Sequence, residues 1–209
     1  MKKIIRSPGS YIQGSGELKN LAEYYEELGS SGAYLIIDSF IYDTRREQIE
    51  SSFSNRSISF QSAVFSGQCC QSEIHRHISQ IGSADAVLGI GGGKTLDTAK
   101  AVAFFTHRPV ILVPTTASSD APCSRLAAIY TENGIFESYL PLSSNPNMII
   151  MDTAVIAQAP VRFLMAGIGD ALSTYYEAAA CERSGAVTSA GGRTTPTAMA
   201  LARLCLGTL

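Results

Sequence analysis

A strand-like run, a cluster of glycines and the start of a helix follow one another between residues 85 and 105. The run from Asp85 to Ile90 is largely apolar and has the length of a buried strand. Residues 91–93 are all glycine, and an amphipathic helical pattern begins at about Lys94. A strand that passes into a helix through so short a turn is typical of α/β folds. This segment therefore constrains the fold more than any other part of the chain.

The same segment predicts a ligand class. Glycines let the backbone approach a bound group closely, and the first N–H groups of a helix attract an anion. Lys94 adds a mobile positive charge. The segment favours a phosphate cradle for a nucleotide, although a tight strand-to-helix turn without any ligand also uses glycine.

Apolar strand-like runs alternate with helical patterns over the first 160 residues. Strands are predicted at residues 33–38, 57–64, 85–90, 110–114 and 147–152, and helices at 16–28, 41–53, 72–81 and 94–105. Such alternation indicates a parallel α/β sheet. The dipeptide Asn133-Gly134 between apolar residues predicts a hairpin within Tyr130 to Phe136.

The pattern becomes helical after Val161. Residues 167–170, Gly-Ile-Gly-Asp, introduce a predicted helix at 171–183, and a glycine-rich break at 185–192 precedes another at 197–206. We therefore expect a domain boundary near residue 160. Residues 1–160 form the nucleotide-binding α/β domain, and residues 161–209 begin an all-helical domain that looks unfinished.

Composition excludes several classes of partner. Hydrophobic residues make up 45% of the chain and charged residues 16%, which suits a globular core, and the formal net charge of −2 without a basic run argues against nucleic acid. No apolar run is long enough to span a bilayer, and the N-terminus lacks the apolar core of a secretion signal, so we expect a cytoplasmic protein. The five scattered cysteines fit neither a zinc knuckle nor a disulfide framework, and the three histidines are interpreted as structural.

Polar side chains follow three of the predicted strands, where ligands of open α/β sheets bind. Asp38 ends the first strand and can accept hydrogen bonds from a ribose diol, but an aspartate there also serves as a helix N-cap. Thr115, Thr116, Ser118 and Ser119 follow another strand. Their hydroxyls suit a phosphate or a nicotinamide amide, although an ordinary Ser/Thr turn has the same composition.

Two aspartates are candidates for chemistry. Asp120 ends the Ser/Thr-rich segment, and Asp170 follows Gly167-Ile168-Gly169 and is predicted to open a helix. A carboxylate such as Asp170 is a good metal ligand when nitrogen or further oxygen ligands join it. The alternative for Asp170 is again an N-cap.

Three motifs taken together resemble the glycerol dehydrogenases of the iron-containing alcohol dehydrogenase family. They are residues 91–100 (GGGKTLDTAK), residues 114–122 (PTTASSDAP) and the stretch from Pro160-Val161-Arg162 to Gly167-Ile168-Gly169-Asp170-Ala171. The resemblance runs along the whole chain and is densest from Gly89 to Arg203.

This resemblance implies a Rossmann-like domain and an NAD-dependent oxidation of glycerol to dihydroxyacetone, with zinc as the Lewis acid. It implies that Asp38 holds the adenosine ribose and that Gly92, Gly93 and Lys94 hold the pyrophosphate. The rest of the cofactor site would be lined by Thr115, Ser118, Ser124, Leu126 and Tyr130. Asp120 would contact glycerol, and Asp170 would be a zinc ligand. We also expect a homo-oligomer.

The chain departs from the family at the metal. The family's zinc site needs two histidines downstream of its aspartate, and no histidine follows Asp170. We therefore expect the N-terminal portion of such an enzyme, with an incomplete zinc site and impaired activity. Two alternatives stay open: a non-catalytic NAD-binding remnant, and another enzyme of the superfamily, such as a glycerol-1-phosphate dehydrogenase or a dehydroquinate synthase. The second would need basic residues around Asp120 to Tyr130, where Arg125 is the only one.

Overall fold

Residues 2–209 are described by a computed structural model, in which the chain divides into two units. The sheet unit comprises Pro8–Thr116 and Ala121–Ala159. The helical unit comprises the N-terminal residues up to Ser7, Ala117–Asp120 and Pro160–Leu209. Two segments from early in the sequence thus belong with the late helices, and a parallel bridge between Lys3 and Arg193 links one of them.

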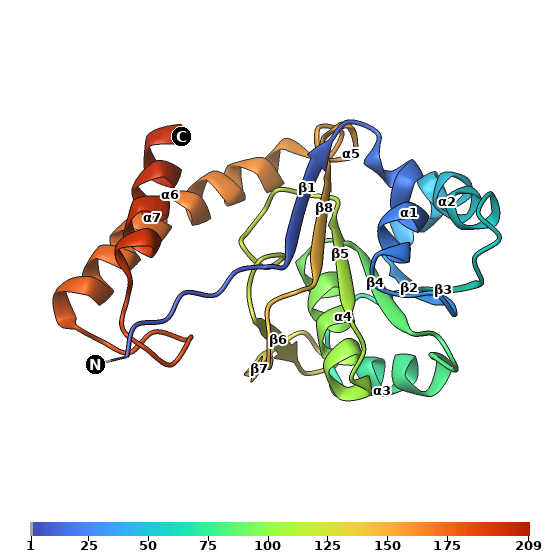
Figure 1. The fold of residues 1–209 in the computed structure, drawn as a ribbon, viewed down its shortest axis with the longest axis horizontal. Coiled ribbons are helices and arrows are strands. Elements are labelled where there is room, and N and C mark those ends of the chain that lie inside the picture. The colour runs from blue at the N-terminus through green and yellow to red at the C-terminus, as the bar shows by residue number, and fades with distance from the viewer. Residues whose placement is uncertain (1) are drawn as a thin grey trace. The chain divides into compact units, whose positions relative to one another are not determined.

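The sheet unit is built on six strands that all run parallel, in the order β1-β8-β5-β4-β2-β3 (Figure 1). The strands are β1 (Ser10–Gly14), β2 (Ala33–Ile37), β3 (Phe60–Val64), β4 (Ala86–Gly91), β5 (Val110–Pro114) and β8 (Met148–Asp152). The predicted parallel α/β fold is confirmed.

Helices cover both faces of this sheet because its central strands are apolar on both sides. Along β2, Ala33, Leu35 and Ile37 belong to one buried cluster, and Tyr34 and Ile36 belong to the other. Such fully buried side chains contribute about 1.5–3 kcal/mol each. The first cluster lies under the 3₁₀ helix η1 (Glu17–Asn20), α1 (Leu21–Glu26) and α2 (Ser39–Ser54). The second lies under α3 (Gln71–Gln80) and α4 (Gly93–Thr106).

A two-stranded antiparallel hairpin follows β5. It pairs β6 (Leu126–Tyr130) with β7 (Phe136–Pro141), as the Asn-Gly signal predicts. Gly134 adopts a φ of 78°, which a glycine reaches without steric cost. Ala127 and Ile129 of β6 are buried in the cluster beneath α4, so the hairpin is fixed to that helix.

The helical unit contains α6 (Val161–Ser184) and α7 (Pro196–Thr208), which pack against each other. Thr195 caps α7 by accepting a hydrogen bond from Ala198 N at 3.0 Å. The prediction that Asp170 opens a helix is wrong, because α6 begins at Val161 and continues through that residue. The N-cap interpretation of Asp170 therefore falls.

Other boundaries also differ from those predicted. The helix expected over residues 16–28 is divided into η1 and α1, and the strand β1 and the short helix α5 (Thr153–Ile156) were not predicted. His77 is fully buried, and its ring contacts Tyr34 Oη at 2.8 Å and Glu73 Oε1 at 3.0 Å. Within residues 2–209 every helix is too short or too polar to cross a membrane.

Candidate nucleotide-binding site

The strand order contains one point where the chain reverses its direction across the sheet. From β2 the chain moves outward to β3, then returns to β4 on the other side of β2 and continues to β5 and β8 (Figure 1). In open α/β sheets, ligands bind outside the carboxyl ends of the strands at such a point. Asp38 follows β2, and the glycine turn follows β4. The backbone N–H of Asp38 donates to Ile90 O at 2.9 Å, so these two strand ends are in contact.

The glycines of the turn serve two different purposes. A Cβ at Gly89 would lie 2.5 Å from Ala99 Cβ, and a Cβ at Gly91 would lie 2.8 Å from the Thr95 hydroxyl oxygen. These two glycines permit α4 to pack closely on the sheet. At Gly92 and Gly93 the nearest atoms to such a Cβ are 4.0 and 3.8 Å away. A Cβ at either position would make only ordinary van der Waals contact, so packing of the chain does not require glycine there.

The N-terminus of α4 has no side-chain cap. Gly92 occupies the N-cap position and, as a glycine, has no side chain that could accept a hydrogen bond from the first turn. The N–H groups of a first turn have no partner inside the helix, and the helix dipole places partial positive charge there. A fourteen-residue helix that begins in this way at the reversal point suits an anionic group.

Lys94 lies in the first turn of α4 and already has two partners. Its Nζ donates to Gln68 Oε1 at 2.7 Å and lies 4.9 Å from the centre of the Tyr130 ring. The cation–π contact and the hydrogen bond hold the ammonium between the loop before α3 and the end of β6. Burial raises the pKa of the Tyr130 hydroxyl, which therefore stays neutral near pH 7.

Asp38 does act as a helix N-cap. Its carboxylate accepts a hydrogen bond from Phe40 N at 3.0 Å and is half-buried. One carboxylate oxygen suffices for this cap, so the cap and a contact with a ribose diol are compatible. The contact with ribose stays a prediction.

The remaining predicted cofactor residues are distributed between the two units. Thr115 is buried, and its N–H donates to Gly91 O at 3.1 Å, which places it directly beside the glycine turn. Ser124, Leu126 and Tyr130 lie in or just before β6. All of these belong to the sheet unit, whereas Ser118 belongs to the helical unit.

Asp120 and Asp170 are both in the helical unit and contact each other. The backbone N–H of Asp120 donates to Asp170 Oδ2 at 2.8 Å. A catalytic zinc normally has three protein ligands, and residues 2–209 contain no group of three His, Cys, Asp or Glu side chains arranged to hold a metal. Asp170 alone does not fit a zinc site, and no chemical step is assigned to a metal here.

Sequence reasoning missed three residues around this site. Gln68 was not singled out, because nothing in its local sequence shows that its loop meets Lys94. Asp97 and Lys100 lie in the part of α4 where every residue from Thr95 to Ala103 is buried. Charges at core positions of an amphipathic helix are a detectable signal, because such groups are rarely buried unless paired.

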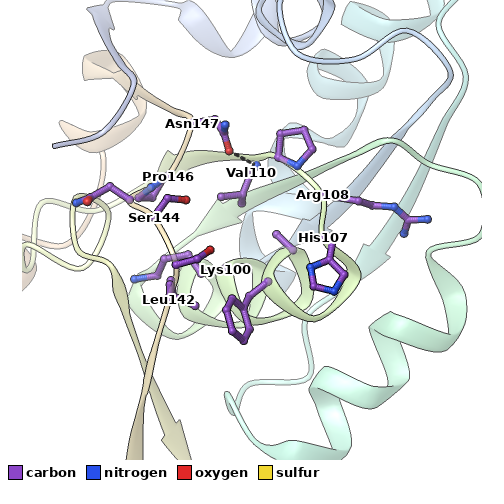
Figure 2. A pocket seen from close by; sticks show the side chains of 13 residues that line it. Lys100, His107, Arg108, Val110, Leu142, Ser144, Pro146 and Asn147 are labelled. Atoms are coloured by element: carbon purple, nitrogen blue, oxygen red, sulfur yellow. Dashed lines mark hydrogen bonds between the residues drawn. The ribbon is translucent and has the colours of Figure 1, made fainter. Parts of the chain in front are cut away.

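A pocket of about 490 Å³ lies at the opposite edge of the sheet. It is lined by residues that precede β5 and β8 and by the end of α4, including His107, Asn145 and Asn147 (Figure 2). Asn147 Oδ1 accepts from Val110 N at 2.9 Å in this pocket, and Arg108 extends away from the other labelled side chains (Figure 2). None of the predicted site residues lines it, so size alone does not make it the candidate site.

The six-stranded parallel sheet with helices on both faces defines an α/β protein of the Rossmann-like class. The chain belongs to the iron-containing alcohol dehydrogenase family, whose model matches residues 8–153.

Known proteins of this family resemble the chain throughout its length. It is 50% identical to a glycerol dehydrogenase of Escherichia coli O6:H1 and 47% identical to one of Pseudomonas putida; these matches cover 100% of this chain and 57% and 58% of those proteins. The crystal structure of glycerol dehydrogenase from Schizosaccharomyces pombe superposes with a TM-score of 0.95 at 37% identity, over 100% of this chain and 53% of that one. The chain thus spans little more than half the length of these relatives.

Proposed function

We propose that the chain binds NAD at the carboxyl ends of β2, β4 and β5, and that it supplies the cofactor-binding part of an NAD-dependent glycerol dehydrogenase. The observation that carries this proposal is a helix N-terminus with a glycine N-cap at the reversal point, where packing does not require glycine at residues 92 and 93. An acidic residue on the neighbouring strand end, Asp38, adds the feature expected for a ribose diol. The names of the relatives support glycerol as the substrate, and the resemblance to the family implies dihydroxyacetone as the product.

The residues of the sheet unit would bind and orient the cofactor. The first-turn N–H groups of α4 and the Lys94 ammonium would hold the pyrophosphate, and Asp38 would accept from the adenosine ribose and repel a 2′-phosphate. Thr115, Ser124, Leu126 and Tyr130 would line the remainder. Bound NAD supplies a hydride acceptor for the carbinol carbon of the substrate.

The remaining assignments rest on the resemblance to the family. We propose Ser118 as a further cofactor contact, Asp120 as a contact for glycerol and Asp170 as one ligand of a zinc ion whose other ligands lie outside residues 2–209. We also propose that residues 1–160 form the NAD-binding domain and that residues 161–209 begin the helical domain for metal and substrate. We also propose that the protein is a homo-oligomer located in the cytoplasm.

Calorimetric titration of the 209-residue chain with NAD tests the central assignment. We expect saturable binding, and we expect Gly93→Val to abolish it, because the added side chain would block the approach of the pyrophosphate to the backbone. The nearest protein atom to a Cβ at this position is 3.8 Å away, so the variant should fold. A folded Gly93→Val variant that binds NAD as well as the parent would show that the turn is only structural.

A second measurement addresses the activity itself. Zinc content and NADH production with glycerol should both be low for residues 1–209 alone, because one carboxylate in water holds zinc weakly. Stoichiometric zinc with steady turnover would refute the proposal that the other zinc ligands lie outside residues 2–209. Binding of NAD without turnover is also the behaviour of a non-catalytic nucleotide-binding protein, so the two measurements together separate cofactor binding from catalysis.

A further inference from the structure

Asp97 and Lys100 are charged residues buried on the face of α4 that packs toward the sheet and the hairpin. Lys100 is 1% exposed and Asp97 is 7% exposed. Lys100 Nζ lies 2.7 Å from Asp97 Oδ1, as an ion pair without the alignment of a hydrogen bond. Burial raises the pKa of Asp97, although the neighbouring ammonium opposes that shift. Burial of two charges is costly unless they are paired and hydrogen-bonded.

The Lys100 ammonium donates all of its hydrogen bonds to one segment. It donates to Ala121 O at 2.9 Å, to Ser124 Oγ at 3.1 Å and to Leu126 O at 2.5 Å. An ammonium has three N–H donors, so these three acceptors exhaust it. Asp97 therefore supplies the opposite charge, and residues 121–126, hereafter the 121–126 segment, receive all of the directional bonds.

Asp97 also binds the chain just after the 121–126 segment. Its second oxygen, Oδ2, accepts from Ala128 N at 3.0 Å, in β6. From the other side, Asn145 Nδ2 donates to Cys123 O at 2.8 Å and Leu142 N donates to Arg125 O at 2.9 Å. The 121–126 segment is thus held on two sides, and the buried ion pair provides its attachment to α4.

Helix α4 carries both the glycine turn and this ion pair. Gly93 opens the helix, and a Cβ there would lie 3.8 Å from Ala121 Cβ, so the start of the 121–126 segment directly borders the turn. Ser124 and Leu126, at its other end, are the residues proposed to line the cofactor. A displacement of this segment would change the width of the cofactor site while leaving the helix in place.

We propose that Lys100, with Asp97 as its counter-charge, is a positioning residue for the cofactor: it fixes the 121–126 segment at a set distance from the glycine turn. This inference rests on the proposed NAD site. Neither residue touches the cofactor. A buried ion pair is weak evidence for a stabilising role, since well-packed apolar replacements often leave stability unchanged. Its geometric role is therefore separable from stability.

The double variant Asp97→Leu/Lys100→Met tests this separation, because it replaces both charges with apolar groups of similar length. We expect the variant to stay folded at the temperature of the titration, with a lower melting temperature because Ala121 O, Leu126 O and Ala128 N lose these partners. We also expect amide exchange in residues 121–128, followed by mass spectrometry of peptides, to accelerate at least tenfold, and NAD affinity by calorimetry to fall by a similar factor. Asp85→Asn is the matched control: it neutralises a hydrogen-bonded carboxylate just before β4, at the opposite edge of the sheet. This control should change neither the amide exchange rate in residues 121–128 nor the affinity for NAD.

The outcomes are distinguishable from those of the proposed function. A double variant that folds, exchanges at the parent rate in residues 121–128 and binds NAD normally overturns the positioning role. A loss of NAD affinity that is fully explained by unfolding of the variant at the temperature of the titration also overturns the positioning role. If the parent itself does not bind NAD, the proposed function fails, and the role of Lys100 in cofactor positioning fails with it even where exchange accelerates. If the double variant does not fold, Asp97→Asn is used: it removes the counter-charge but keeps an oxygen for Ala128, and unchanged exchange and affinity there refute the proposal.

Discussion

The backbone N–H of Asp120 donates a hydrogen bond of 2.8 Å to the carboxylate of Asp170, fifty residues further along the chain. One turn earlier on the same helix, a Cβ at Gly167 would lie 2.0 Å from Ala117 O. The loop at residues 117–120 therefore rests on α6 at a position that only glycine permits. Gly167 thus has a packing role inside a helix.

This contact predicts how the loop responds to substitution of Asp170. Asp170→Ala should accelerate amide exchange at Asp120 by about tenfold, because a hydrogen bond to a charged group contributes about 1.5–3 kcal/mol before solvent screening. Asp170→Asn keeps an acceptor oxygen and should show a smaller change. Exchange measured by NMR decides between them. Equal rates in the parent and Asp170→Ala would contradict the bond.

Asp38→Ser should narrow the preference for NAD over NADP. The carboxylate lies beside the glycine turn and would repel a 2′-phosphate, whereas serine is neutral. Serine is also a good N-cap, so the start of α2 should survive the change. Calorimetric titration with both cofactors measures the ratio of affinities. Equal affinity of the parent for NAD and NADP would refute the role of Asp38.

Lys94→Ala should weaken NAD binding by about 1–3 kcal/mol, the contribution of a charge-assisted hydrogen bond. Gln68→Leu is the matched comparison, because it removes the partner of Lys94 but keeps the positive charge. We expect a clearly smaller loss in Gln68→Leu, measured by the same titration. Losses of equal size in both variants would mean that Lys94 acts only through its contact with the loop before α3.

Asp85 should make the sheet unit less stable in acid. Burial alone would raise the pKa of this carboxylate, but hydrogen bonds from the Tyr25 hydroxyl and the backbone of Ser30 and Ser31 lower it to about 2. An unfolded aspartate has a pKa of about 3.9. The stabilisation is therefore complete above pH about 4 and is lost as the pH falls toward 2. Urea unfolding over this range should show a weaker pH dependence in Asp85→Asn, and identical slopes would contradict the assignment.

The helix α6 should promote association of the chain with a second copy of itself. None of its twenty-four residues is buried, and Val161, Met165, Ile168, Leu172 and Tyr176 recur at helical spacing with exposures of 39–71%. Exposed apolar patches of this kind favour association. Light scattering should show concentration-dependent oligomers, which Leu172→Glu should reduce. A parent chain that is monomeric at all concentrations would refute this.

The sequence predicted the central strands of the sheet because Ala33–Ile37 and Val110–Pro114 are continuous apolar runs, which only a sheet covered on both faces requires. It did not predict β1, whose SYIQG has two apolar residues and lies at an exposed sheet edge. The start of α6 was misplaced because glycines at 167 and 169 resemble a helix boundary. Gly167 is required because it packs against Ala117, fifty residues away in the chain, and a local sequence pattern does not show such a contact.

The candidate site was accessible to sequence reasoning only where backbone geometry demands a residue type. Glycines at 92 and 93 and an acid at 38 have that property. The distinction between packing glycines and open glycines needed the positions of Ala99 and Thr95 in three dimensions. Gln68 contacts Lys94, 26 residues away in sequence, and Lys100 contacts Ser124, 24 residues away. Contacts between residues so far apart leave no periodic pattern in the sequence.

The pairing of β1 with β8 has a consequence for how the chain folds. Ser10 aligns with Met148, so the first strand must wait for nearly all of the sheet unit before it finds its partner. Contacts between residues so distant in sequence raise the entropic cost of the folding transition state. Until that step, β8 presents an apolar strand edge to other chains, and unpaired edges of this kind are templates for aggregation. During synthesis on the ribosome, the N-terminal residues therefore remain unpaired until the strand that completes the sheet has emerged.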